Sequence, residues 1–197
     1  MWLIQSRGAS LDIEEGPGKD EAGCAERPVE AESLPQKEFV LRMQTDTVLV
    51  VERVFQHHRT ELFQAFIEPA KLAQWFAPKG WHVLPESVEI DPKVGGRLRH
   101  TKVRDDGSGQ PWVVDGVYTE VFYPDVLVTR QRITGVAGID PAKPVELRLE
   151  FTKMGRDDTL LKVVQGPYTQ AAAMDYSDGW ESILDRLNTF LSMGARA

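Results

Sequence analysis

Residues 51–78 read VERVFQHHRTELFQAFIEPAKLAQWFAP, and within them the hydrophobic pattern changes from that of a strand to that of two helices. The stretch begins inside TVLVVERVF, residues 47–55, whose β-branched and partly alternating pattern predicts a strand. Thr60 is a candidate cap for a first helix, because apolar residues follow it at helical spacing. Pro69 suits the first turn of a second short helix, which Pro78 and Gly80 would end.

Strand-like runs then follow one another closely along the chain. Gly, Pro and Asp clusters separate them, which indicates turns. The spacing leaves no room for crossover helices, so neighbouring strands are expected to pair antiparallel. These runs lie near residues 82–90, 97–103, 112–121, 126–133, 145–151 and 159–165.

The C-terminal stretch changes period again. Between residues 176 and 191, apolar side chains recur at spacings of three and four, which predicts a long amphipathic helix. Asp178 with Glu181 offers a capping box, although a start near Thr169 also fits. Gly179 inside this helix costs about 1 kcal/mol relative to alanine, which suggests that another group packs closely against it.

Composition and charge narrow the class of protein. The 197 residues are 42% hydrophobic, enough for one domain with its own core. No apolar run reaches the roughly 20 residues that span a bilayer, residues 1–10 lack the apolar stretch of a secretory signal, and Cys24 is the lone cysteine. A cytoplasmic protein without membrane insertion, disulfides or a cysteine-based zinc cluster is therefore expected.

The acidic residues concentrate near the N-terminus. Residues 12–38 hold nine carboxylates against three bases, so they account for −6 of the net charge of −7. We predict that residues 1–37 form a disordered or loosely packed acidic extension, and that residues 38–197 form the folded domain. Neither part has the basic surplus of a nucleic-acid-binding protein.

Four stretches in this order resemble one known family. They are residues 51–78, VGGRLRH (94–100), DGVYTEVFYPDVLVTR (115–130) and GWESILDRL (179–187). Together they resemble the START-like (SRPBCC, helix-grip) superfamily, in the branch named after the activator of the heat-shock-protein-90 ATPase. The likeness runs from about residue 47 to 191; His58 stands where many relatives have proline, and Leu98 where a larger aromatic is common.

The resemblance implies an α+β fold of order β-α-α-β6-α. A curved antiparallel sheet of seven strands would wrap around the long C-terminal helix, often enclosing an apolar cavity. Members of the superfamily bind lipids, hormones or polyketides, while some are enzymes and others act with chaperones. The fold alone therefore constrains function weakly.

On this basis we predict a set of cavity-lining, ligand-binding residues. If Leu98 faces the interior, strand alternation sends His100 the same way, and Tyr118 and Glu120 share a face of their strand. Arg97 and Arg99 have the opposite parity, and the sequence does not decide which set points inward. The predicted residues are Trp75, Phe76, Leu98, His100, Tyr118, Glu120, Trp180, Leu184 and Leu187.

The leading hypothesis is a domain that binds a small hydrophobic, lipid- or polyketide-like molecule, as a monomer or homodimer. Alternatives are a chaperone-associated regulatory interaction module and a cyclase- or dehydratase-type enzyme using His100 or Glu120 as acid–base. No cofactor, metal ligand or catalytic residue is assigned. The pair His57–His58 is interpreted as a turn before the first helix rather than as a metal site, and neither a Gly-x-Ser-x-Gly elbow nor a phosphate-binding loop occurs.

Overall fold

The computed structural model describes residues 47–137 and 139–194, so the predicted acidic extension and its boundary at residue 37 lie outside the described residues. The described residues belong to one compact unit. Its elements are β1 Thr47–Phe55, α2 Arg59–Ile67, α3 Pro69–Trp75, β2 Trp81–Val83, the 3₁₀ turn η2 Pro85–Ser87, β3 Glu89–Ile90, β4 Arg97–Arg104, β5 Trp112–Phe122, β6 Val126–Thr134, β7 Val145–Met154, β8 Asp158–Tyr168 and α4 Gln170–Gly194.

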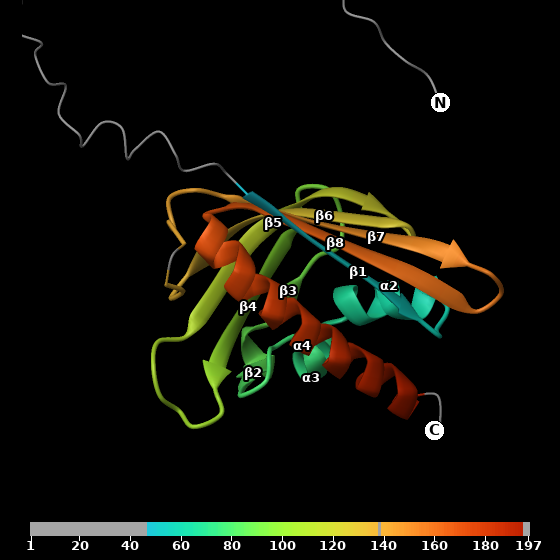
Figure 1. Cartoon of the computed structure of the whole chain (residues 1–197), viewed down its shortest axis with the longest axis horizontal. Helices are drawn as coiled ribbons and strands as arrows, with labels where there is room; N and C mark the ends of the chain where they lie inside the picture. The colour runs from blue at the N-terminus through green and yellow to red at the C-terminus, as the bar shows by residue number, and fades with distance from the viewer. Residues whose placement is uncertain (1–46, 138, 195–197) are drawn as a thin grey trace, which may run out of the picture. The chain divides into compact units, whose positions relative to one another are not determined.

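One antiparallel sheet curves around helix α4 (Figure 1). Its strand order is β1-β8-β7-β6-β5-β4-β2, with β3 also paired to β4. This confirms the predicted helix-grip architecture. The run predicted as one strand near residues 82–90 is instead two short strands, because η2 begins at Pro85, which has no N–H to give to a strand ladder.

Helix α2 has its N-cap two residues before Thr60, the predicted cap. His58 is the N-cap residue, in an extended conformation, and its Nδ1 lies 3.4 Å from the Thr60 backbone N and 2.8 Å from the Thr60 hydroxyl oxygen. The helix buries the predicted apolar face of Leu62, Phe63, Ala65 and Phe66. Thr60 thus supports the cap from inside the first turn.

The junction between α2 and α3 depends on Trp75. In a continuous helix, the carbonyl of Ala65 would accept a bond from the fourth residue along, but that residue is Pro69, which has no N–H. The indole Nε1 of Trp75 donates to this carbonyl instead, at 3.3 Å. The Trp75 ring is 1% exposed and meets Phe66 and Phe76 edge-to-face at 4.8 and 5.2 Å. Trp75 therefore holds the two short helices together.

Helix α4 begins at Gln170, as the earlier of the two predicted starts requires. The Thr169 hydroxyl accepts from the backbone N of Ala172 at 3.3 Å, which is the geometry of an N-cap, and Asp178 lies well inside the helix. The side chains of Trp180, Leu184 and Leu187 are almost fully buried against the sheet and α3. This buried stripe packs the middle of α4 against the core.

Candidate functional site

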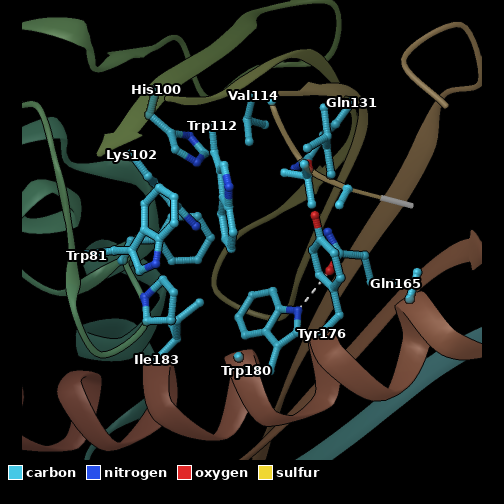
Figure 2. Close-up of a pocket in the computed structure, with 18 of the residues that line it drawn as sticks. Trp81, His100, Lys102, Trp112, Val114, Gln131, Gln165, Tyr176, Trp180 and Ile183 are labelled. Atoms are coloured by element: carbon cyan, nitrogen blue, oxygen red, sulfur yellow. Dashed lines mark hydrogen bonds between the residues drawn. The ribbon is translucent and has the colours of Figure 1, made fainter. Parts of the chain in front are cut away.

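A cavity of about 360 Å³ lies between the inner face of the sheet and the N-terminal half of α4. Figure 2 shows Tyr176, Trp180 and Ile183 rising from the helix toward side chains that descend from the strands. The exposed loop residues at 109–110 and 135–137 also line it, so its mouth lies between the β4–β5 and β6–β7 loops.

Aromatic rings form much of the cavity wall. The Trp81 and Trp112 rings pack with centroids 4.3 Å apart, and Tyr176 lies nearly parallel to Trp112 at 6.4 Å. Tyr176 also stacks on Tyr168 at 4.8 Å. Trp180 closes the helix side, and its Nε1 donates to Gln165 Oε1 at 2.8 Å, which satisfies both buried groups. The wall is therefore mainly apolar and well ordered by mutual packing.

Several buried polar atoms at the cavity have no hydrogen-bond partner among the described residues. They are both ring nitrogens of His100 and the hydroxyl of Tyr176. His100 is 1% exposed, and its burial, with the nearby charge of Lys102, lowers its pKa well below the ordinary value. The imidazole is thus neutral near pH 7, with one nitrogen able to donate and the other to accept.

Strand β4 presents a row of basic side chains to the cavity. His100, Lys102 and Arg104 alternate along it and all line the wall. Lys102 is 7% exposed, and burial with the charge of Arg186 lowers its pKa to about 7. Its Nζ lies 4.3 Å from the centroid of Phe76. No Asp or Glu among the described residues lines the cavity.

Of the predicted residues, the structure brings Phe76, His100 and Trp180 together at the cavity. Leu98 and Tyr118 lie deeper, around a space of about 20 Å³ that Phe76 also borders. The remaining apolar residues of the prediction are buried core residues that do not line the larger cavity. These are Trp75, Leu184 and Leu187.

Glu120 was predicted to share a face of β5 with Tyr118, but it does not line the cavity, and the cause lies in the pairing of β5 with β6. Tyr118 pairs with Thr129 and Glu120 with Val128, so β5 has one more residue than β6 at this point. This β-bulge breaks the alternation. Tyr118 consequently points inward, while Glu120 is part-exposed and forms an ion pair with Arg148 at 3.1 Å. Glu120 therefore cannot act as an acid or base inside the cavity.

Lys102 and Arg104 also line the cavity but are not among the residues predicted from the sequence. The signal was present, because residues 98–104 read LRHTKVR, and the alternation that carries Leu98 and His100 inward continues through Lys102 to Arg104. The prediction followed only the first two positions. Trp81 and Trp112 stand at strand starts, where periodicity gives little indication of orientation.

Gly179 also differs from expectation. A methyl group built on it would meet no atom within 4 Å, so no neighbour requires glycine here. The residue lines the cavity, and the open space beside it belongs to the site. A small residue on this helix turn therefore keeps the cavity wide.

We expect Gly179→Ala to raise the free energy of unfolding by about 0.5–1 kcal/mol, because alanine favours the helix and finds room for its methyl group. Urea denaturation measures the change. Gly116→Ala is the matched control and should destabilise, because its methyl group would lie 2.5 Å from the Arg130 carbonyl oxygen. If both variants lowered stability alike, Gly179 would not border open space.

The curved antiparallel sheet, the helix that it wraps and the cavity between them define a helix-grip domain of the START-like superfamily. The family model described as activator of Hsp90 ATPase homolog 1-like protein matches residues 56–192. The chain therefore belongs to this family, as its sequence motifs predicted. No curated protein matches the chain in sequence.

Solved structures show the same fold. The AHSA1 protein of Silicibacter pomeroyi is 22% identical, with a TM-score of 0.65 over 75% of this chain and 99% of that one. A protein of Chromobacterium violaceum is also 22% identical, with a TM-score of 0.65 over 74% of this chain and 96% of that one. None of the described helices is long and apolar enough to cross a membrane, and the described residues hold no cluster of three or more metal-binding side chains.

Proposed function

We propose that this domain binds one small, mainly apolar molecule in the cavity between the sheet and α4. The observation that carries the proposal is a space of about 360 Å³ with aromatic walls and buried polar atoms that lack protein partners. Ligand sites commonly occupy 300–1,000 Å³ and combine apolar walls with a few convergent polar groups.

The unpartnered atoms indicate the kind of ligand. A buried polar group without a hydrogen bond costs about 1–3 kcal/mol, so such groups tend to be retained where something else bonds them. His100 offers one donor and one acceptor from β4, and Tyr176 offers a hydroxyl from α4. A ligand with a carbon skeleton against the tryptophans and a polar end toward β4 uses both parts of the site.

The neutral fluorescent probe N-phenyl-1-naphthylamine tests the proposal. We expect saturable binding with energy transfer from tryptophan, since Trp81, Trp112 and Trp180 line the cavity. Gly179→Phe should abolish this binding, because its ring would occupy the open space beside α4. The matched control, Val117→Phe, adds a ring at a side chain exposed on β5 and should bind the probe as the unmodified protein does.

Equal binding by Gly179→Phe and the unmodified protein would contradict a ligand site in this cavity, as would the absence of saturable binding. A changed ATPase rate of an Hsp90 chaperone, without probe binding, would instead favour the regulatory interaction module.

A further inference from the structure

We propose that the ligand carries a single anionic head group, a carboxylate, and that the ammonium group of Lys102 is its counter-ion. This inference rests on the proposed function, because it assigns a chemical class to the molecule in the same cavity. It adds a charged anchor to a site whose walls are otherwise mainly apolar.

The charges around the cavity favour an anion. Lys102 and Arg104 both line it from β4; Lys102 is buried, whereas Arg104 is exposed and its guanidinium lies over the Trp81 ring. The Arg186 guanidinium of α4 lies close enough to affect Lys102. Arg186 itself is held by three carbonyl oxygens, those of Ala77, Pro78 and Trp81, at 3.0, 3.3 and 2.7 Å. Among the described residues, no carboxylate lines the cavity, although the whole chain carries a net charge of −7; Asp106 interacts with Arg104 from outside the lining.

The environment of Lys102 is incomplete without an anion. Its contact with the Phe76 ring compensates its charge only in part, since an aromatic face is a weak substitute for water or a carboxylate. Burial consequently lowers the Lys102 pKa to about 7. A bound carboxylate would restore the charged form by direct pairing, and one negative charge matches one ammonium group.

Binding of an anion should therefore depend on pH through Lys102. The other titratable or charged groups that line the cavity or act on Lys102 are His100 and Arg104 on β4, and Arg186 and Tyr176 on α4. The pKa of His100 is lowered well below 6.5 and burial raises that of Tyr176, so neither titrates between pH 7 and 9. Guanidinium groups stay charged throughout. Between pH 7 and 9 Lys102 loses its proton. Since the anion pairs with the charged form, its binding above pH 7 requires Lys102 to take up a proton again.

Two probes that share one skeleton separate charge from shape. N-phenyl-1-naphthylamine is neutral, and 8-anilinonaphthalene-1-sulfonate carries a fixed negative charge on the same skeleton. We expect the dissociation constant of the anionic probe to rise between pH 6 and pH 9, by up to about 100-fold, because Lys102 is mostly uncharged at the higher pH. The affinity of the neutral probe should change little.

Variants of Lys102 identify the group responsible. Lys102→Met should weaken the anionic probe at pH 6 by about tenfold or more and remove its pH dependence, without weakening the neutral probe. Lys102→Arg keeps a charge that does not titrate in this range, so it should retain anion binding and lose the pH dependence. Val117→Phe, on the exposed face, is the control for nonspecific adsorption and should behave as the unmodified protein.

The outcomes distinguish the two proposals. Suppose that Gly179→Phe loses neutral-probe binding, while the affinity of the anionic probe changes neither with pH nor in Lys102→Met. This result would overturn the anionic head group and would still support the apolar ligand site. If Gly179→Phe weakened the binding of neither probe, the ligand site in this cavity would be overturned. Anion binding that falls with pH in the unmodified protein but not in Lys102→Met or Lys102→Arg would support both.

Discussion

Lys102→Met is expected to raise the free energy of unfolding near pH 6 by several kcal/mol, although the change removes a charge from a protein of net charge −7. Burial moves the Lys102 pKa from 10.5 to about 7. Each pKa unit corresponds to about 1.4 kcal/mol, so the buried ammonium destabilises the fold by up to about 5 kcal/mol. Methionine has similar length and fills the space without this penalty.

The same variant should change how stability depends on pH. Between pH 7 and about 10, the unfolded chain keeps the lysine proton that the folded protein has lost. The free energy of unfolding of the unmodified protein should therefore rise with pH through this window, and the advantage of Lys102→Met should shrink. Measurements above pH 10 are avoided, because buried tyrosines such as Tyr118 have raised pKa values and then reduce stability.

Urea denaturation at pH 6 and pH 9 measures both effects. Lys162→Met is the matched control: its side chain is 38% exposed and lies 3.5 Å from Glu52, so the change should be small at either pH. Equal stability of Lys102→Met and the unmodified protein at pH 6, with parallel pH profiles, would contradict a destabilising buried charge. Groups that weaken the fold in this way are concentrated at functional sites, which is why the effect bears on the proposed anion site.

The architecture was predictable because it depends on features that repeat along the chain. Strand alternation, helical spacing and turn residues each recur over many positions, so the element order and antiparallel pairing follow without side-chain detail. Irregularities that involve a single residue do not repeat along the chain, so periodicity does not predict them. The break at Pro85 and the extra residue between Tyr118 and Glu120 adjust the sheet to its curvature, and curvature is a property of the assembled sheet.

The cavity was predictable only in part for a related reason. Alternation placed His100 on the same face of its strand as Leu98 without deciding which face is the inner one; in the structure both residues are buried, and the same alternation extends to Lys102. Whether an inward-pointing side chain borders a cavity or packs in the core depends on which residues lie opposite it in the folded domain. Gly179, which suggested close packing, borders open space, whereas Trp75, which suggested a cavity wall, lies in the core. Neither distinction is encoded in local spacing.

Trp75→Ala is expected to lower the free energy of unfolding by about 3–5 kcal/mol, the range for removing a large buried aromatic side chain. The ring is 1% exposed and packs edge-to-face on Phe66 and Phe76. The substitution also removes the donor for the Ala65 carbonyl, which Pro69 cannot satisfy. Since a domain of this size is stable by about 5–15 kcal/mol, much of that stability depends on this one side chain.

Two matched variants separate the contributions. Trp75→Phe keeps a ring but loses the indole N–H, so it should cost about 1–3 kcal/mol for the buried carbonyl left without a partner. Trp112→Ala removes a tryptophan that is only partly buried and borders the cavity, so it should destabilise less than Trp75→Ala. Urea denaturation of all three decides the order. A larger loss for Trp112→Ala than for Trp75→Ala would mean that the cavity wall, rather than the junction between α2 and α3, stabilises this end of the domain.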